Sequence, residues 1–229
     1  MNSGPMLFLG LFCAVASSFW GLILLPQVTI GRQAPVVSDN GQPYPWPRPG
    51  VAQEGAAIYR AHGCVECHTQ QVRQKNHLVD PVEQKRGWGT RFTVAQDYLR
   101  DVPVLLGSQR IGPDLANAGL RITDEKQVLV HLFNPRLTVS DSIMPRYPFL
   151  FEQRPVVAGQ APPADALGDV GQPAQFAVVP RPEARALVAY LMSLRANEPL
   201  FETAVEKPKT NTVAQASAMT NAPATATAK

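Results

Sequence analysis

Three residues that lie close together in the chain, Cys64, Cys67 and His68, are of types that bind metals or carry redox chemistry. They form a C-x-x-C-H sequence within the stretch GCVECHTQQVR, residues 63–73. Two thiols at this spacing can form a redox disulfide, supply half of a zinc site, or attach a c-type haem covalently. Each interpretation needs different partners elsewhere in the chain, so the rest of the sequence discriminates among them.

The partners needed for the first two interpretations are missing. A redox pair of cysteines is expected near a βαβ pattern, and the sequence predicts no strands that could build one. Zinc needs about four nitrogen or sulfur ligands. The third cysteine, Cys13, lies in an apolar N-terminal segment, and His77 and His131 are not spaced as a second ligand pair. We therefore predict haem attachment through both cysteines, with His68 as the proximal ligand of the iron.

A haem iron that carries electrons takes a sixth ligand, usually Met or His. Met144 lies in the stretch SIMPRYP, where the flanking prolines predict a stiff loop that holds a thioether at a fixed place. The other methionines fall in the N-terminal segment, a predicted helix or the C-terminal tail (Met1, Met6, Met192 and Met219). Three histidines are weaker candidates, because one is too near the C-x-x-C-H sequence and the others are predicted to be exposed or packed (His62, His77 and His131). We predict Met144 as the sixth ligand.

The stretch IGPDL, residues 111–115, lies between the two predicted ligands. A metal-bound histidine nearly always donates from its other ring nitrogen to a carbonyl or carboxylate, which fixes the ring orientation. The carbonyl of Pro113, in a rigid turn, would serve as this acceptor. The alternative is an ordinary Pro-Asp turn with no such role.

Residues 6–30 contain no Asp, Glu, Lys or Arg. At a rise of about 1.5 Å per residue, a helix of this length crosses a hydrocarbon core of roughly 30 Å. The alternative is a cleaved signal peptide, but residues 1–5 carry no Lys or Arg and the apolar run is longer than a signal core. We predict an uncleaved single-span membrane anchor over residues 1–32. Only Arg32 lies close to either end, so the flanking charges do not orient the helix.

The rest of the chain divides by composition into three parts. Residues 33–50 are rich in Pro and Gly and predict an extended linker. Residues 51–198 form one all-α domain with long Pro-rich loops. Residues 199–229 are a low-complexity tail, rich in Ala, Thr and Asn, that could not bury enough apolar surface to order itself alone.

Helix signals define the domain. We expect one helix over Val51–Ala61, ended by a left-handed Gly63, and another over Asp124–Asn134 with Thr123 as its N-cap. A third is expected over Pro182–Asn197, where apolar residues repeat at helical spacing. A short amphipathic piece is expected near residues 93–100 and a loop over residues 153–179.

The formal charge is small, at +3, and no basic run is interleaved with aromatic residues. Nucleic acid is therefore not an expected partner.

The C-x-x-C-H sequence, the GPDL turn, the Met-Pro loop and a C-terminal helix with Ala189-Tyr190-Leu191 together resemble class I cytochrome c. The resemblance implies that the Pro113 carbonyl accepts from His68. It also implies that the first and last helices of the domain cross, which would place Ile58 or Tyr59 near Tyr190 and Leu194.

A narrower resemblance rests on GCVECHTQQVR, RIGPDLANAG (110–119), NPR (134–136) and SIMPRYPFL (142–150). These stretches are similar to the mono-haem subunit II of cbb3-type cytochrome c oxidases. The likeness covers about residues 6–150 and 186–194. The Pro/Ala-rich residues 153–179 and the tail depart from it.

The resemblance implies a subunit that passes electrons through one covalent haem c and makes or breaks no bond itself. Its implied partners are a haem-copper catalytic subunit, a di-haem cytochrome c subunit or soluble cytochrome donor, and membrane lipid. Because haem is attached outside the cytoplasmic membrane, the domain is expected in the periplasm on a single-pass inner-membrane anchor. By position, Arg73, Arg110 and Trp88 are candidates to contact the haem propionates, with solvated surface residues as the alternative.

Other functions share this plan. The membrane-anchored cytochrome c subunit of nitric oxide reductase and a stand-alone membrane-anchored cytochrome c both fit an anchor plus one haem. The HTQQVR continuation after the C-x-x-C pair favours the oxidase. A haem sensor with an open sixth position is a further alternative, and the prolines around Met144 argue against it.

Overall fold

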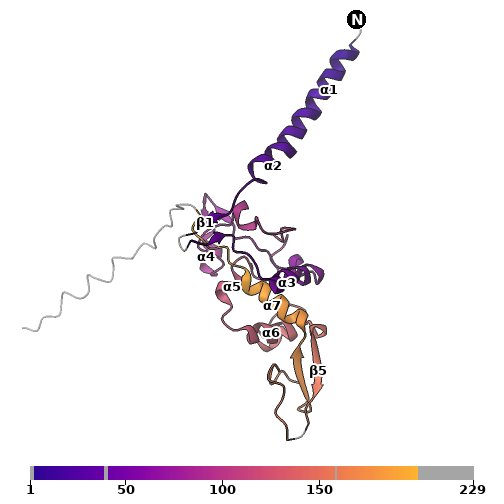
Figure 1. Cartoon of the computed structure of the whole chain (residues 1–229), viewed down its shortest axis with the longest axis vertical. Coiled ribbons are helices and arrows are strands. Elements are labelled where there is room, and N and C mark those ends of the chain that lie inside the picture. The colour runs from indigo at the N-terminus through magenta and orange to yellow at the C-terminus, as the bar shows by residue number, and fades with distance from the viewer. Residues whose placement is uncertain (1–2, 39–40, 158, 201–229) are drawn as a thin grey trace, which may run out of the picture.

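The computed structural model describes residues 3–38, 41–157 and 159–200. It is elongated, with an N-terminal helix projecting from one end of a folded domain and a β-hairpin from the other (Figure 1). The predicted C-terminal tail beyond Leu200 lies outside the described residues.

The N-terminal helix runs through Gly4–Thr29, a length of 26 residues. It comprises α1 (Gly4–Phe19), a π-helical turn η1 (Trp20–Leu24) and α2 (Leu25–Thr29). No residue of these three elements is buried against the rest of the chain. A helix of this length and apolar composition fits a membrane anchor.

The segment predicted as an extended linker folds onto the domain. It contains a small antiparallel pair, β1 (Val36–Val37) with β2 (Pro43–Tyr44). The ring of Tyr44 is 2% exposed, and its hydroxyl donates to the buried carboxylate of Asp97. The second half of the segment is therefore part of the domain and not a free spacer.

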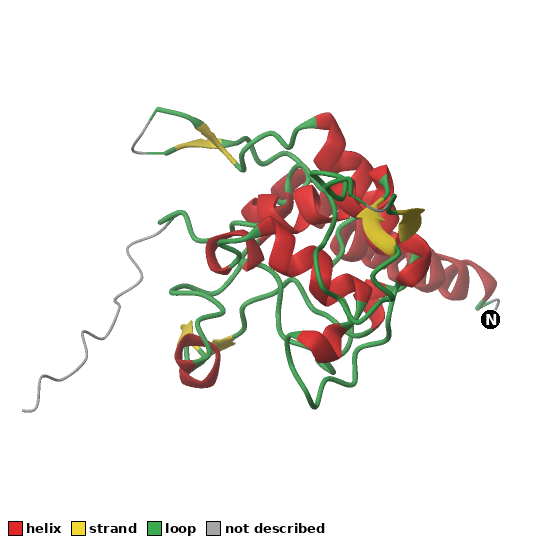
Figure 2. Cartoon of the chain, turned by 90° about the horizontal axis from the view of Figure 1, so that it is seen from below, coloured by secondary structure: helices red, strands yellow, loops and turns green. Residues whose placement is uncertain are grey.

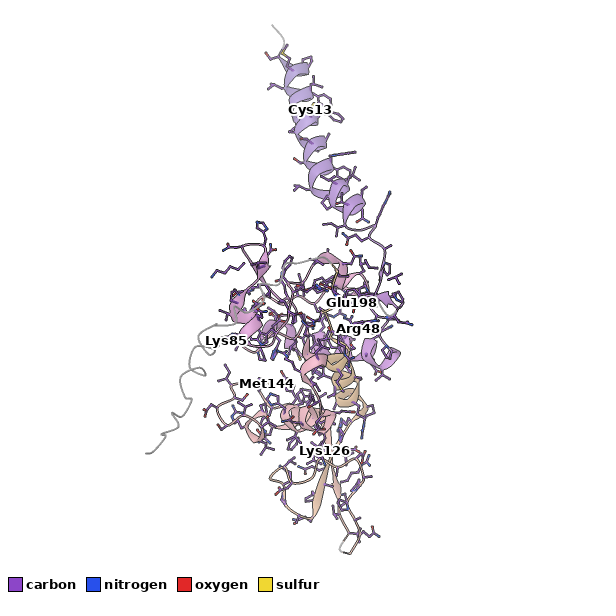
Figure 3. The ribbon with its side chains drawn as sticks, turned by 90° about the vertical axis from the view of Figure 1, so that its left-hand side faces the viewer. Cys13, Arg48, Lys85, Lys126, Met144 and Glu198 are labelled. Atoms are coloured by element: carbon purple, nitrogen blue, oxygen red, sulfur yellow. The ribbon has the colours of Figure 1, made fainter. Side chains whose placement is uncertain are left out.

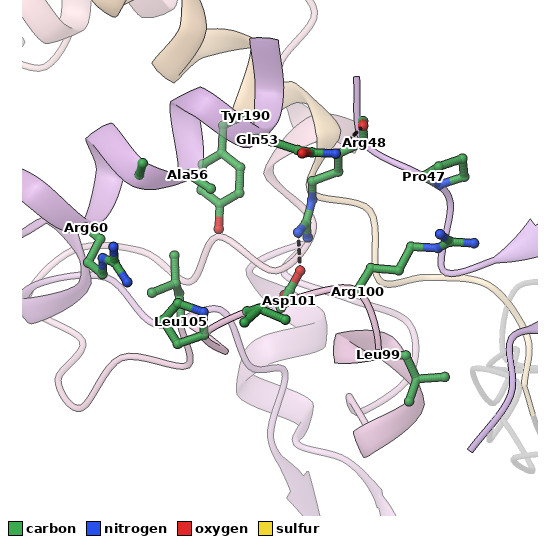
Figure 4. Close-up of a pocket in the computed structure, with 13 residues that line it drawn as sticks. Pro47, Arg48, Gln53, Ala56, Arg60, Leu99, Arg100, Asp101, Leu105 and Tyr190 are labelled. Atoms are coloured by element: carbon green, nitrogen blue, oxygen red, sulfur yellow. Dashed lines mark hydrogen bonds and ion pairs between the residues drawn. The ribbon is translucent and has the colours of Figure 1, made fainter. Parts of the chain in front are cut away.

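The end of the same segment closes a surface pocket of about 540 Å³ (Figure 4). Arg48 forms an ion pair with Asp101 in this pocket, and its guanidinium carbon lies 5.4 Å from the centre of the Tyr190 ring. Ala56 and Ala57 form a second wall. The pocket contains none of the predicted haem-site residues, and its contacts fix the linker to the helices of the core.

Two crossing helices form the centre of the domain: α3 (Gly50–Ala61) and α7 (Pro182–Ser193). Gly55 lies at the crossing, where a Cβ atom would come within 1.9 Å of the Ala186 carbonyl oxygen. Close to this point the rings of Tyr59 and Tyr190 are 5.4 Å apart. The predicted contact between Tyr59 and Tyr190 is confirmed.

Shorter elements surround this crossing (Figure 2). They are η2 (Cys64–Glu66), β3 (Gln74–Lys75), β4 (Leu78–Val79), α4 (Pro81–Lys85), η3 (Ala95–Tyr98), α5 (Ala118–Arg121), α6 (Glu125–Phe133), η4 (Pro135–Leu137) and η5 (Pro148–Leu150). β3 and β4 pair antiparallel. The amphipathic piece expected near residues 93–100 is the single 3-10 turn η3.

Two predicted helix ends were wrong. The N-cap of α6 is Asp124 and not Thr123, because the Asp124 carboxylate reaches the backbone N–H of Lys126 at 2.9 Å. The last helix ends at Ser193 and not Asn197, because the backbone after it forms hydrogen bonds with residues 116–119 instead of continuing the helix. The carbonyl of Leu194 accepts from Gly119 N at 2.9 Å.

The prediction of an all-α domain was also wrong, because residues 151–180 contain an antiparallel pair. β5 (Phe151–Pro155) pairs with β6 (Phe176–Pro180), and only the residues between them are the expected loop. Val178 and Val179 of β6 are each 1% exposed. β-branched residues favour strands when their side chains can pack, and the Pro/Ala-rich composition concealed this short apolar run.

The helix crossing generates a first prediction. Gly55→Ala should destabilise the domain by about 1–3 kcal/mol, because the added methyl group meets backbone atoms of Ala186 that cannot rotate away. Urea unfolding of the two proteins measures the difference. Gly50→Ala is the matched control, since a Cβ at Gly50 meets nothing within 4 Å. Equal losses in the two variants would contradict the tight crossing.

Candidate functional site

The C-x-x-C-H sequence follows α3 through a turn that its residues specify. Gly63 has a φ of 68°, the left-handed conformation expected at the end of this helix. The 3-10 turn η2 then carries Cys64, and the backbone N–H of His68 donates to the Cys64 carbonyl at 3.0 Å. Both Cys64 and Cys67 are free thiols. Burial raises the pKa of the Cys64 thiol to about 11, so this group is protonated at neutral pH.

The imidazole of His68 is oriented by the Gly-Pro loop, residues 111–116. The His68 Nδ1 atom lies 2.8 Å from the Pro113 carbonyl oxygen. Because a carbonyl can only accept, Nδ1 carries the proton and Nε2 keeps its lone pair. Burial lowers the pKa of His68, which keeps the ring neutral. This is the protonation state that a metal-ligating histidine needs.

Gly112 permits this arrangement. A Cβ atom at this position would lie 2.3 Å from Cε1 of the His68 ring. The backbone N–H of Gly112 also donates to the Cys67 carbonyl at 2.9 Å. The absence of a side chain lets the loop lie flat against the imidazole.

A buried carboxylate joins the two loops. Asp114 is 0% exposed and accepts from Thr69 Oγ1 at 2.6 Å and from the backbone N–H of Gln71 at 2.8 Å. It also accepts from Ala116 N at 2.9 Å. Asp114 thereby fixes the residues after His68 to the residues after Pro113. Sequence reasoning missed this role, although the acidic residue stands directly after Pro113.

Met144 lies in a loop beside the C-x-x-C-H sequence. It is partly buried and packs against the apolar core cluster that includes Cys64. Its backbone N–H donates to Ser142 Oγ at 3.3 Å, and Tyr147 N donates to Leu132 O at 3.0 Å. The first bond lies within the loop, and the second fixes the loop to the helix α6.

Tyr147 connects this loop to the first cysteine. A hydrogen bond between its hydroxyl and Cys64 acts on the pKa of the thiol. Burial, followed by the nearby thiols, raises the pKa of Tyr147 to about 12. The methionine loop and the C-x-x-C-H sequence therefore border the same core region.

The other histidines have different surroundings. The ring of His62 lies 5.0 Å from the ring of Phe149, and His77 is exposed in a turn with a φ of 64°. His131 is half-buried on α6, where its Nδ1 bonds to Thr138 Oγ1. Burial lowers the pKa of His131.

Arg110 is occupied by protein acceptors. Its three guanidinium nitrogens bond to Thr69 Oγ1, to Glu83 and to the Gln71 carbonyl oxygen. Trp88 is 7% exposed, and its ring lies 5.3 Å from the Arg110 guanidinium carbon. These contacts give both residues a structural role beside His68.

The residues present fit a haem better than zinc. Cys13 lies in the anchor, well away from the domain that contains Met144 (Figure 3). Within the described part of the chain, no group of three or more His, Cys, Asp or Glu side chains gathers to hold a metal ion. Two free thiols, a neutral imidazole with one lone pair available and a nearby thioether are instead the donor set of a covalently held haem.

The buried carboxylate generates a second prediction. Asp114→Asn should lower the free energy of unfolding by about 2–4 kcal/mol, because an amide supplies only one acceptor oxygen to the N–H and O–H donors around it. Chemical denaturation monitored by circular dichroism measures the loss. Asp124→Asn is the control, because Asn caps a helix as well as Asp does. Losses of equal size at both positions would contradict the role of Asp114.

Comparison with known proteins identifies the family. No curated protein gives a significant match to the chain. The family model described as cytochrome c oxidase, mono-heme subunit/FixO, matches residues 2–175, which is most of the sequence. The chain therefore belongs to the FixO family, the mono-haem subunit II of cbb3-type cytochrome c oxidases.

Proposed function

We propose that this chain is the electron-transfer subunit of a membrane-bound cbb3-type oxidase, with one haem c attached through Cys64 and Cys67. His68 and Met144 would supply the nitrogen and sulfur ligands of its iron. The observation that carries the proposal is the bond from His68 Nδ1 to the Pro113 carbonyl, which leaves the lone pair of Nε2 available on the residue that directly follows Cys67.

Each residue has a separate task in this proposal. Cys64 and Cys67 form the two thioether bonds and fix the porphyrin edge. Pro113 orients the ring of His68, and Gly112 leaves space for it. The prolines around Met144 stiffen the thioether loop, and the bond from Tyr147 N to the Leu132 carbonyl oxygen fixes it to α6. A bound haem would supply one-electron redox chemistry to the chain.

The fold supports this task by limiting movement. The two helices at the core cross in tight contact, and the methionine loop is bonded to α6. A rigid surrounding keeps the ligand geometry alike in both oxidation states, which is what an electron carrier needs. The proposed partners are a haem-copper catalytic subunit and a di-haem cytochrome c subunit or soluble cytochrome donor. The domain then lies in the periplasm, on an anchor in the inner membrane.

The axial assignment gives a third prediction. Met144→Ala should abolish the weak red absorption band of a thioether bound to ferric haem, while the haem stays attached to the chain. Met192→Ala is the control, because Met192 lies in α7 and should leave the band unchanged. A band that survives in Met144→Ala, or that is missing from the native protein, would contradict the assignment.

His68→Ala should lose proximal ligation, and Cys64→Ala should leave the haem attached at one thioether or not at all.

The oxidase assignment gives a fourth prediction. The full-length chain, purified from its native membrane in mild detergent, should bring with it a subunit that contains copper. Metal analysis of the co-purified subunits measures this. A partner with non-haem iron and no copper would favour the nitric oxide reductase alternative.

A further inference from the structure

Glu83 and Arg110 form an ion pair against the loop that follows His68. Glu83, on α4, is 2% exposed and accepts from the backbone N–H of Arg73 at 2.5 Å. Its carboxylate forms an ion pair with Arg110, whose side chain is 13% exposed. Buried charges are costly unless they are paired and hydrogen-bonded, and these two groups satisfy each other.

The pair is connected to the proposed proximal ligand through a continuous set of hydrogen bonds. Arg110 Nε donates to Thr69 Oγ1 at 2.7 Å, and the Thr69 hydroxyl donates to Asp114 at 2.6 Å. Thr69 directly follows His68, and Asp114 directly follows Pro113. Arg110 therefore holds both ends of the contact between His68 and Pro113.

Charges of both signs lie close together in this group. The two carboxylates of Glu83 and Asp114 enclose the guanidinium of Arg110, which lies 3.6 Å from Asp114. The Trp88 ring covers this guanidinium from one side, at 5.3 Å from its central carbon. A second guanidinium, that of Arg121, donates to the Asp114 carbonyl oxygen at 2.5 Å, so two positive charges face two negative ones. In an interior of low dielectric, the loss of any one of these charges acts more strongly than it would in water.

We propose that Glu83 and Arg110 are positioning residues that orient His68 through Thr69 and Asp114, and that their charges set the reduction potential of the haem. This inference rests on the proposed function. A negative charge near His68 stabilises the more positive ferric state, and a positive charge destabilises it. Removing negative charge should therefore raise the potential, and removing positive charge should lower it.

Redox titration of the full-length protein in detergent at neutral pH tests the signs. Glu83→Gln should shift the midpoint potential upward, and Arg110→Gln should shift it downward. The double variant returns the net charge of the group to its native value, so its potential should lie between those of the single variants. Arg110→Lys keeps the charge and should stay closest to the native potential.

Two controls separate electrostatics from stability. Glu152→Gln removes a carboxylate from the exposed ion pair of Glu152 and Arg154, and should leave the potential unchanged. Urea unfolding of every variant shows whether the potential merely follows stability, since both single variants lose the same ion pair. If Arg110→Gln does not fold, the comparison of Glu83→Gln with Arg110→Lys still decides the matter, since the first should raise the potential and the second should leave it near the native value.

Shifts of the same sign in Glu83→Gln and Arg110→Gln would overturn the inference while leaving the proposed function standing. So would a potential that falls in step with stability. A native protein that holds no covalent haem would overturn the proposed function and this inference together.

Discussion

The arrangement of the site depends on one fully buried carboxylate. Asp114 accepts three hydrogen bonds and has Arg110 at 3.6 Å, which offsets the cost of removing its charge from water. Through these bonds the chain after His68 is fixed to the chain after Pro113. The bond between His68 Nδ1 and the Pro113 carbonyl is then a consequence of two loops that are already joined. The other ring nitrogen, Nε2, keeps its lone pair.

Buried polar contacts also bind the segment after the membrane anchor to the domain. The segment after the anchor is bound to the domain by Tyr44, through Asp97, and by Arg48, through Asp101. From Tyr44 onward the chain therefore moves with the domain, and fewer residues separate the anchor from it than the composition of the linker suggests.

The parts of the fold and of the site that depend on local sequence signals could be predicted from the sequence. The C-x-x-C-H sequence, Gly63 and the helices of the core are local signals, and the structure places them as expected in α3 and η2. The contact of Tyr59 with Tyr190 came from a family resemblance and was confirmed. The strands β5 and β6 were missed because their pairing joins residues about 25 positions apart, which no local periodicity records. Glu83 was missed for a similar reason, since a single acidic residue in a short helix looks solvated until the position of Arg110 is known.

The central claim is that Cys64 and Cys67 hold one haem covalently. Intact-mass measurement of the purified full-length chain tests it most directly. The account predicts a mass that exceeds the polypeptide by one haem, and a return to the polypeptide mass when both cysteines are replaced by alanine. A native chain without this added mass, with Cys64 and Cys67 joined in a disulfide or bound to zinc, would contradict it.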